Sequence, residues 1–293
     1  LTVDSLRGKL PIGGTILGTS RFQPFMVDDG VERFAAALGT LGIDAVIAIG
    51  GEGTLGCAKD LAALGYPIVG VPKTIDNDLA GTEMTFGFQT AVQICTDAID
   101  RLHTTAESHD RVMVVEVMGR HAGHIAAWSG MAGGATMTLI PEVPFDIDAV
   151  CEAIARRHEA GRYASIVVVA EGARPLPGTL DIPEPEVDAY GHQRLGGIGT
   201  TIGGEIERRT GFETRVTILG HIQRGGSPNA FDRVLASRYG VAAIDAVHDG
   251  AYGEMVCLRA GKIERITLAE AKAMGLKTVD PQLYEVAKVF FAV

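Results

Sequence analysis

Residues 44–78 read DAVIAIGGEGTLGCAKDLAALGYPIVGVPKTIDND, and the order of apolar runs and glycines in this stretch decides the fold. Asp44–Ile49 is apolar after its first residue and opens into glycines, after which Leu55–Leu64 has helical spacing. Ile68–Val71 is a second apolar run that ends in polar residues. A continuous apolar run is typical of a strand buried on both faces of a parallel sheet. The stretch therefore predicts a strand, a glycine loop, a helix and a second strand.

The same succession recurs further along the chain. Apolar runs at Arg111–Val117, Ser165–Ala170 and Val216–Leu219 each lead into a polar segment that contains glycine. Strands that alternate with helices predict parallel α/β sheets, whose ligands bind outside the carboxyl ends of the strands. The fold class expected from the sequence is therefore α/β, with functional residues in the segments that follow the strands.

The composition excludes several classes of function. The 293 residues are 46% hydrophobic and 21% charged, which is typical of a folded globular protein with one large or two moderate domains. Because 26 basic residues face 36 acidic ones, the net charge is −10, which disfavours a nucleic-acid partner and requires any anionic substrate to meet a local basic cluster. The four cysteines form no CxxC pair and predict buried thiols in a reducing compartment. We expect a cytoplasmic protein with no signal peptide and no membrane partner.

The glycine segment Gly50–Thr54 follows the first predicted strand. Glycines at such a turn let backbone N–H groups approach a phosphate, and the N-terminus of the next helix favours negative charge. The carboxylate of Glu52 lies among them and could hold Mg²⁺. A turn of this kind is equally often purely structural, so the segment alone leaves both interpretations open.

Thr74, Asp76 and Asp78 alternate after the second predicted strand. In an extended segment their three side chains face one way, and two carboxylates on one face repel each other unless a cation or a substrate hydroxyl lies between them. The alternative is a turn whose Asp residues cap the next helix, which accounts for one Asp better than for both. The pattern favours a catalytic or binding site.

Arginines lie at or beside the predicted strand ends, at positions 111, 120, 215 and 224, together with His221. A single arginine at such a place is best interpreted as a solvated charge. Guanidinium groups bind phosphate through two hydrogen bonds, and the recurrence beside several glycine-rich segments favours a phosphate-binding cluster.

These motifs together resemble the 6-phosphofructokinase family. The resemblance rests on GGEGT (Gly50–Thr54), PKTIDND (Pro72–Asp78), SHDRVMVVEVMGRHAG (Ser108–Gly123) and LGHIQRGGSP (Leu219–Pro228), in this order, and it covers the chain from about Gly13 to the C-terminal region. The glycine loop alone is shared with NAD kinases and lipid kinases, which leave the other motifs unexplained.

The resemblance implies transfer of a phosphoryl group to the C1 hydroxyl of fructose 6-phosphate. Asp76 matches the catalytic base, Thr74 is also expected to act in catalysis, and Thr74, Asp76 and Asp78 match positions that bind the substrate. Glu52 matches an acid associated with Mg²⁺ that is Asp in many members. Arg21 matches an arginine that contacts the phosphates of the donor. The full set of donor-binding residues implied by the resemblance is Arg21, Phe22, Gly51, Glu52, Gly53, Thr54, Gly56 and Lys73.

The sugar phosphate has its own set of implied residues. Met118, Gly119, Arg120, Glu171, His221 and Arg224 match positions around fructose 6-phosphate, and Arg120 is also expected to act in catalysis. Arg111 and Arg215 match two arginines that reach the 6-phosphate from a neighbouring subunit, so the resemblance implies a homodimer or homotetramer.

Two residues point to different phosphoryl donors. ATP-using members carry Gly where Gly53 stands, whereas pyrophosphate-using members carry Asp, which fills the space of the α-phosphate and ribose. Pyrophosphate enzymes carry Lys where Lys73 stands, although some ATP enzymes combine Gly with Lys. We expect ATP as the donor, with pyrophosphate as the alternative.

The chain also departs from the family. The family begins with a strand and a GGD-x-PG-x-N phosphate loop upstream of GTILG (Gly14–Gly18), and neither is present, so we expect this segment alone to be unstable or inactive. An inactive member that only binds ligand is therefore a further alternative. The acid that binds the regulatory metal in allosteric bacterial members aligns with Thr136, which argues against nucleotide activation of that kind.

The expected architecture is two Rossmann-like three-layer α/β domains with mainly parallel sheets that face a central cleft. We assign residues 1–87 and 224–280 to the donor domain, residues 88–223 to the fructose 6-phosphate domain, and residues 281–293 to a C-terminal tail.

Overall fold

The stretch 44–78 folds into strand β1 (Val46–Gly50), helix α3 (Glu52–Ala63) and strand β2 (Ile68–Thr74) in the computed structural model, which describes residues 2–20, 22–182 and 195–291. The helix begins earlier than the sequence predicts: Gly51 is its N-cap, so Glu52, Gly53 and Thr54 form its first turn rather than a loop. Their backbone N–H groups are consequently the open donors of a helix N-terminus.

The described chain divides into two compact units, Leu1–Gln89 with Gly226–Lys277, and Thr90–Gly225 with Thr278–Val293. In the first unit, β1, β2 and β8 (Glu254–Arg259) are parallel neighbours in that order, and β9 (Lys262–Thr267) follows antiparallel to β8. The short β3 (Phe86–Gly87) pairs with the end of β2. Its helical elements are α1 (Val3–Leu6), η1 (Pro24–Met26), α2 (Gly30–Leu41), α3, α8 (Ala230–His248) and α9 (Leu268–Ala273).

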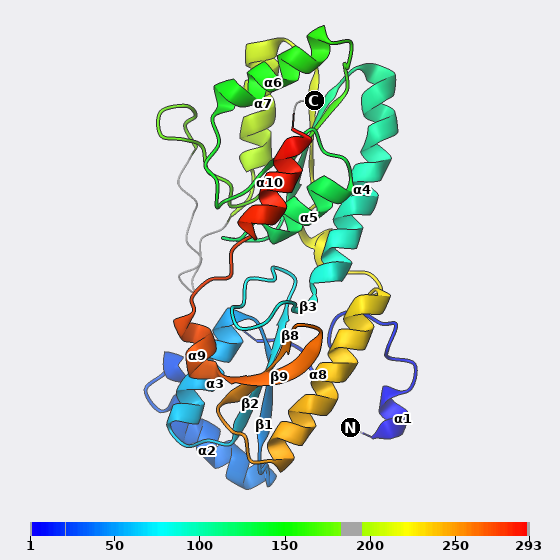
Figure 1. Ribbon diagram of the computed structural model, residues 1–293. Helices are drawn as coiled ribbons and strands as arrows, with labels where there is room; N and C mark the ends of the chain where they lie inside the picture. The colour runs from blue at the N-terminus through cyan, green and yellow to red at the C-terminus, as the bar shows by residue number, and fades with distance from the viewer. Residues whose placement is uncertain (1, 21, 183–194, 292–293) are drawn as a thin grey trace. The chain divides into compact units, whose positions relative to one another are not determined.

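Alternate residues of the first sheet enter two different cores. Ile68 and Met255 pack with Leu55 on the side of α3, whereas Val69 and Val256 pack with residues of α8 on the other side. Figure 1 shows α2 and α3 on one face of this sheet and α8 on the opposite face. The first unit is therefore a three-layer α/β sandwich.

The second unit has a parallel sheet with the order β5 (Met137–Leu139), β6 (Ser165–Ala170), β4 (Val112–Val117) and β7 (Thr214–Ile218). All residues of β4 and β6 are buried, as their apolar runs predict. Helices α6 (Ile147–Glu159) and α7 (Ile198–Thr210) cover one face through a core that includes Val114 and Val167, and α5 (His124–Ala132) packs against β5 and β6. Helix α4 (Phe88–His109) begins in the first unit and continues into the second, which also holds η2 (Gly220–Arg224).

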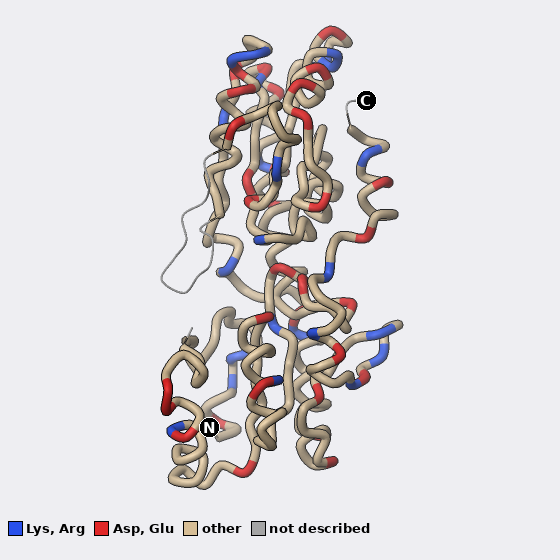
Figure 2. Tube along the Cα trace, turned by 90° about the vertical axis from the view of Figure 1, so that its left-hand side faces the viewer, with Lys and Arg blue, Asp and Glu red and all other residues tan. Residues whose placement is uncertain are grey.

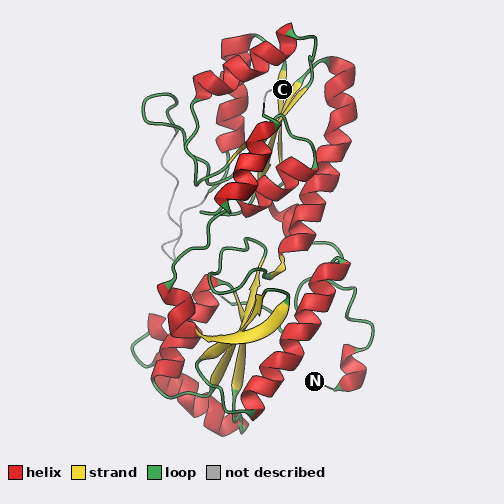
Figure 3. Ribbon diagram, viewed as in Figure 1, coloured by secondary structure: helices red, strands yellow, loops and turns green. Residues whose placement is uncertain are grey.

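Both units confirm the predicted fold class of α/β with mainly parallel sheets, and Figure 3 shows the helices around each sheet. The C-terminal residues differ from the expected tail, because Pro281–Val289 forms helix α10. This helix packs on α5, and its buried Tyr284 hydroxyl donates a hydrogen bond to the backbone oxygen of Thr138 in β5 at 2.9 Å. Its buried apolar side explains why it belongs to the second unit.

A buried carboxylate in β4 fixes the start of α7. Glu116 is 2% exposed, and its two carboxylate oxygens accept hydrogen bonds from the backbone N–H groups of Gly197 and Gly199 at 2.8–3.1 Å. A helix N-terminus attracts negative charge, so this arrangement satisfies both the carboxylate and the otherwise open amide groups.

Replacing Glu116 with Gln should destabilise the second unit. The new amide group removes the negative charge and cannot accept one of these hydrogen bonds, which costs about 2 kcal/mol and lowers the melting temperature by roughly 4–8 °C. Calorimetry of the Glu116→Gln protein tests this, with the exposed Glu159→Gln on α6 as the matched control. Equal melting temperatures for the two variants would contradict the role of Glu116.

Candidate active site

The segment after β2 bends instead of continuing as a strand. Asn77 has a backbone φ of 52°, in the left-handed region, so the extended alternation predicted for Thr74, Asp76 and Asp78 is wrong beyond Asp76. Asparagine adopts this conformation more readily than most residues. The turn places Asp76 back against the end of β2 rather than farther along a strand.

Asp76 is 6% exposed and contacts Thr74 directly. The backbone N–H of Asp76 donates to Thr74 Oγ1 at 3.1 Å, and Thr74 Oγ1 donates to Asp76 Oδ2 at 3.4 Å. The buried Thr85 supports the same turn, because its hydroxyl donates to the backbone oxygen of Thr74 at 2.8 Å and its N–H donates to Asn77 Oδ1 at 3.1 Å. The structure thus holds a carboxylate in a defined orientation at the carboxyl end of a parallel strand.

The first turn of α3 lies beside this segment. A Cβ built on Gly51 would lie 3.6 Å from Thr74 Cβ, which places the N-cap of α3 against the end of β2. Thr54 approaches Gly50 so closely that a Cβ there would be 2.4 Å from its hydroxyl oxygen, so position 50 requires glycine. The predicted donor-binding residues Gly51, Glu52, Gly53 and Thr54 are therefore brought together next to Thr74.

The other predicted donor residues surround this turn less closely. Gln23 donates from Nε2 to the backbone oxygen of Gly53 at 3.2 Å, which ties the segment of the exposed Phe22 to α3. Lys73 is exposed at the end of β2, and Gly56 lies one turn into α3. Arg21 lies outside the described residues.

Glu52 is the one predicted metal ligand. Its side chain is 64% exposed, and its Oε1 pairs with Lys272 Nζ of α9 at 2.6 Å. Among the described residues there is no group of three His, Cys, Asp or Glu side chains that could hold a metal ion. A single carboxylate nevertheless fits Mg²⁺, which proteins often bind through one or two carboxylates together with substrate phosphates.

In the second unit, the segment after β4 is held in an unusual backbone conformation. Arg120 has a φ of 53° and Gly119 a φ of 144°, and the N–H groups of both donate to Glu171 Oε1 at 3.0 and 3.2 Å. A Cβ on Gly172 would lie 1.9 Å from the backbone oxygen of Arg120, so glycine is required there for the close approach of β4 and β6 segments. Glu171 therefore shapes the segment that the sequence predicts to bind a sugar phosphate.

Gln223 connects the segments that follow β4 and β7, and sequence reasoning missed it. This side chain is 1% exposed, its Oε1 accepts from the N–H of Met118 at 3.0 Å, and its Nε2 donates to the backbone oxygen of Gly220 at 3.0 Å. Its predicted neighbours His221 and Arg224 are exposed on η2. The buried Gln223 thus fixes η2 beside Met118, so that Met118, His221 and Arg224 lie at one edge of the sheet.

Arg111 and Arg215 meet at a shared carboxylate. Arg111 pairs with Glu213 at 2.6 Å, and Arg215 also pairs with Glu213 and donates to the backbone oxygen of Thr214 at 2.9 Å. The Arg111 guanidinium lowers the pKa of the Glu213 carboxyl. Because two guanidinium groups share one carboxylate, the group of Arg111, Arg215 and Glu213 keeps a net positive charge.

This pair lies far from the other predicted sugar residues of the same chain. Arg111 precedes β4 and Arg215 lies near the start of β7, whereas Arg120 and Arg224 follow the two strands. The six residues of β4 span roughly 20 Å at about 3.3 Å per residue. The arginines therefore form two groups at opposite edges of one sheet, and the predicted single cluster is wrong within one chain.

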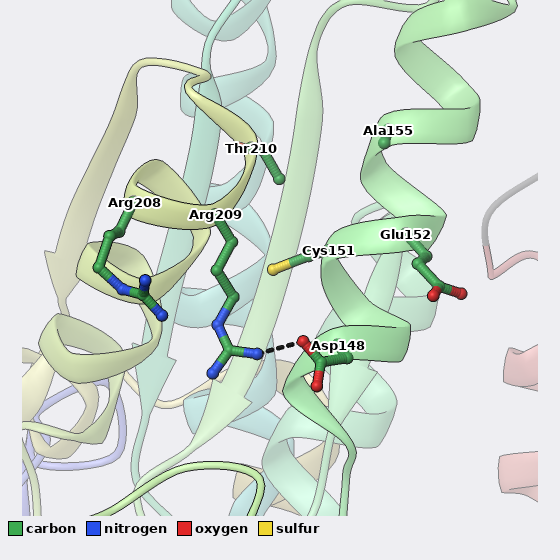
Figure 4. Close-up of a pocket in the computed structure, with 7 residues that line it drawn as sticks. All are labelled: Asp148, Cys151, Glu152, Ala155, Arg208, Arg209 and Thr210. Atoms are coloured by element: carbon green, nitrogen blue, oxygen red, sulfur yellow. Dashed lines mark hydrogen bonds and ion pairs between the residues drawn. The ribbon is translucent and has the colours of Figure 1, made fainter.

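A hollow between α6 and α7 gathers further charged residues (Figure 4). Arg209 pairs there with Asp148 and with Glu205, and Arg208 pairs with Glu205 at 2.8 Å. These arginines lower the pKa of Glu205 to about 2. Burial raises the pKa of the neighbouring Cys151, which keeps it a thiol. Both arginines are neutralised by carboxylates, so the hollow is a contact between two helices rather than a candidate anion site.

Figure 2 shows that positions of Lys and Arg are interspersed with positions of Asp and Glu along the trace of each unit. Thr136, aligned with a regulatory acid, is buried and accepts a hydrogen bond from the N–H of Ile166 at 3.1 Å. No helix in the described part of the chain has the length and apolar character needed to cross a membrane.

The comparisons with known proteins agree with these motifs. The phosphofructokinase family model matches residues 1–247. A pyrophosphate–fructose 6-phosphate 1-phosphotransferase from Streptomyces coelicolor is 58% identical over 99% of this chain and 85% of its own length. An ATP-dependent 6-phosphofructokinase from Corynebacterium efficiens is 56% identical over 95% of this chain and 80% of its own length.

A solved structure shares the fold as well. The phosphofructokinase of Pichia pastoris in its T-state matches with a TM-score of 0.80 and 32% identity, over 99% of this chain. This chain spans only 31% of that longer protein. The extent of the family match and the identity to its members lead to one conclusion: the chain belongs to the phosphofructokinase family.

Proposed function

We propose that the protein transfers a phosphoryl group to the C1 hydroxyl of fructose 6-phosphate to give fructose 1,6-bisphosphate, a reaction of glycolysis in the cytoplasm. The observation that carries the proposal is the buried Asp76 carboxylate, oriented by Thr74 at the end of β2. Membership of the phosphofructokinase family supports it, as do relatives at 53–58% identity that are named ATP-dependent 6-phosphofructokinase or pyrophosphate–fructose 6-phosphate 1-phosphotransferase.

Asp76 acts as the general base in this proposal. Its carboxylate accepts the proton of the C1 hydroxyl as that oxygen attacks the phosphoryl group, and Thr74 keeps the carboxylate oriented. A carboxylate is a weak base for an alcohol, but phosphoryl transfer depends more on positioning and charge stabilisation than on full deprotonation. Arg120 would stabilise negative charge on the transferred phosphoryl group. Asp78, at the end of the same segment as Asp76, would contact the substrate.

The sugar phosphate would bind along the edge formed by the segments after β4, β6 and β7. Glu171 holds the backbone of Gly119 and Arg120 in place, which presents these residues to the sugar. His221 and Arg224 are exposed beside them and can hydrogen-bond sugar hydroxyls. The residues assigned to the sugar are Met118, Gly119, Arg120, Glu171, His221 and Arg224.

Glu52 would hold Mg²⁺ together with the donor. The cation neutralises charge on the phosphates when it is bound. The donor phosphates themselves would lie at the N-terminus of α3, where the N–H groups of the first turn and the helix dipole favour anions. Lys272 pairs with Glu52 and balances the negative charge of this exposed carboxylate.

We favour ATP as the donor because of the space at Gly53. Among the described residues, a Cβ at this position would meet only Gln23 Nε2, at 3.5 Å, so the space that an Asp side chain would fill here is open. Pyrophosphate is the second candidate, since Lys73 is exposed at the end of β2 and relatives of both kinds share more than half of this sequence.

The donor experiment measures fructose 1,6-bisphosphate formed from fructose 6-phosphate and Mg²⁺ by the purified protein with the family's N-terminal strand and phosphate loop restored, with ATP and with pyrophosphate in separate reactions. We expect turnover with ATP. Turnover with pyrophosphate alone would mean that Lys73 outweighs the open position at Gly53. Absence of product with both donors, while fructose 6-phosphate still binds, would support the inactive ligand-binding member instead.

The separation of Arg111 and Arg215 from Arg120 supports an oligomeric enzyme. Because the two groups lie at opposite edges of one sheet, one ligand cannot contact both within one chain. In a homodimer or homotetramer, Arg111 and Arg215 of one subunit would bind the 6-phosphate in the site of its neighbour.

Mixed oligomers test this assignment. Arg215→Ala should raise KM for fructose 6-phosphate by about 10- to 100-fold, because it removes a charge-assisted hydrogen bond to the phosphate. Hybrids made by co-expressing Arg215→Ala and Asp76→Asn chains should regain sites with wild-type KM, since one site then takes Asp76 and Arg215 from different chains. Hybrids without such sites would exclude the shared arrangement, and Arg156→Ala on the surface of α6 serves as the control.

A further inference from the structure

The C-terminal end of the first unit runs alongside the segment that carries Asp76. Leu276 forms an antiparallel bridge with Leu79, and the backbone N–H of Lys277 donates to the backbone oxygen of Asp78 at 3.0 Å. The two stretches are distant in the sequence: Lys277 and Asn77, which are in contact, are 200 residues apart. Both belong to the first unit, of which Lys277 is the last residue.

The side chain of Lys277 is anchored at three oxygen atoms. Its Nζ donates to Asn77 Oδ1 at 2.8 Å, to the backbone oxygen of Thr82 at 3.0 Å and to the backbone oxygen of Glu83 at 2.8 Å. An ammonium group has three N–H donors, so each of these three oxygens can accept one of them. The side chain therefore links both ends of the turn formed by residues 77–83.

Asn77 is the point through which this anchor can act on Asp76. It lies between Asp76 and Asp78 in the left-handed backbone conformation, and its Oδ1 accepts hydrogen bonds from both Lys277 and the N–H of Thr85. A rotation at Asn77 would turn the peptide that joins it to Asp76. The Thr85 hydroxyl donates to the same oxygen at 3.4 Å, so donors from two distant parts of the chain oppose that rotation.

The electrostatic setting indicates that the charge at position 277 is costly. Burial lowers the pKa of Lys277 to about 8, although Asp78 and Glu83 act in the opposite direction. A lysine used only for solubility would extend into water, as Lys262 does on β9. Lys277 instead withdraws its ammonium group from water to contact the turn.

We propose that Lys277 is a positioning residue for the proposed phosphoryl transfer: through Asn77 it fixes the turn that aims the Asp76 carboxylate at the attacking hydroxyl. This inference rests on the proposed function. It predicts that loss of Lys277 lowers kcat, because Asp76 is misaligned, and changes KM for fructose 6-phosphate little, because the residues assigned to the sugar belong mainly to the second unit.

The test compares Lys277→Met, which keeps the length of the apolar stem, with Lys277→Arg, which keeps the charge, and with the exposed control Lys262→Met. We expect kcat of Lys277→Met to fall by about 10- to 100-fold with KM within about threefold of the wild type, and Lys277→Arg to restore part of kcat. An unchanged kcat in Lys277→Met, or a change confined to KM, would overturn the proposal.

Hydrogen exchange separates a failure of this inference from a failure of the proposed function. If Lys277 fixes the turn, the amides of residues 76–85 exchange at least tenfold faster in Lys277→Met than in Lys262→Met, whatever substrate the protein uses. Unchanged exchange there would overturn the proposal even in a protein that is active. If Lys277→Met does not fold, the same two measurements are made on Lys277→Gln, which keeps a shorter N–H donor.

Discussion

Asp76→Asn is expected to lower kcat for fructose 1,6-bisphosphate formation by about 10³-fold, within the range that a positioned general base contributes. The substitution keeps the size of the side chain and an oxygen that can accept from Thr74, but an amide cannot accept the proton of the C1 hydroxyl. The buried position leaves little access for a water molecule to replace the carboxylate. Steady-state kinetics with the preferred donor measure the effect.

Binding of fructose 6-phosphate should survive this substitution. Calorimetric titration of the Asp76→Asn protein should give a Kd within about threefold of the wild type, since the phosphate and most of the sugar are assigned to other residues. The control is Asp100→Asn, on the exposed surface of α4. Turnover within tenfold of the wild type would remove Asp76 from the role of base.

Gly53→Asp is expected to lower kcat/KM for MgATP by at least about 100-fold. The new carboxylate would project from the first turn of α3 toward the donor phosphates, and a like charge placed against a bound anion costs several kcal/mol. Folding should be little affected, because a Cβ has room there and an acidic residue suits the first turn of a helix.

Two variants separate charge from size at this position. Gly53→Ala adds the Cβ without the charge and should keep most of the ATP activity. Gly39→Asp adds the same charge in an open position on α2 and should leave kcat/KM unchanged. If Gly53→Asp retained full ATP activity, the donor would not pass over this turn of α3, and the assignment of ATP would lose its structural support.

The sequence predicts the strands that are buried on both faces. β2, β4 and β6 are continuous apolar runs followed by glycine or polar residues, a pattern that arises because parallel strands are covered by helices on both sides. β1 carries the same kind of run, but it is the terminal strand of its described sheet and Ile49 is 49% exposed, so its predicted burial on both faces is wrong. The hairpin of β8 and β9 has a short run of this kind at Met255–Leu258 in β8, which is not among the predicted strands, and none in β9. Its two-residue turn places Ala260 at a φ of 47° and Gly261 at 75°, and alanine is not a residue that signals this type of turn.

In the candidate site, too, some residues can be predicted from the sequence and others cannot. The short motifs identify Asp76, Glu52 and Arg120 because their chemistry is carried by residues close together in the sequence. Other residues act through partners that are distant in the sequence. Glu213 pairs with Arg111, 213 − 111 = 102 residues away, and Lys277 contacts Asn77, 200 residues away. Gln223 likewise contacts Met118. Local spacing carries no information on such pairs, whereas the topology of the sheets creates them.

The discontinuous first unit has a consequence for how the chain folds during synthesis. β2 gains its neighbour β8 only through the pair of Gly70 and Met255, which are 255 − 70 = 185 residues apart. All the strands of the second sheet emerge from the ribosome in the interval. Pairing across so long a separation is slow, because the entropy of closing the intervening chain must be lost first. The second sheet is thus expected to form early and shorten that separation, which makes its assembly a kinetic prerequisite for the sheet that holds Asp76.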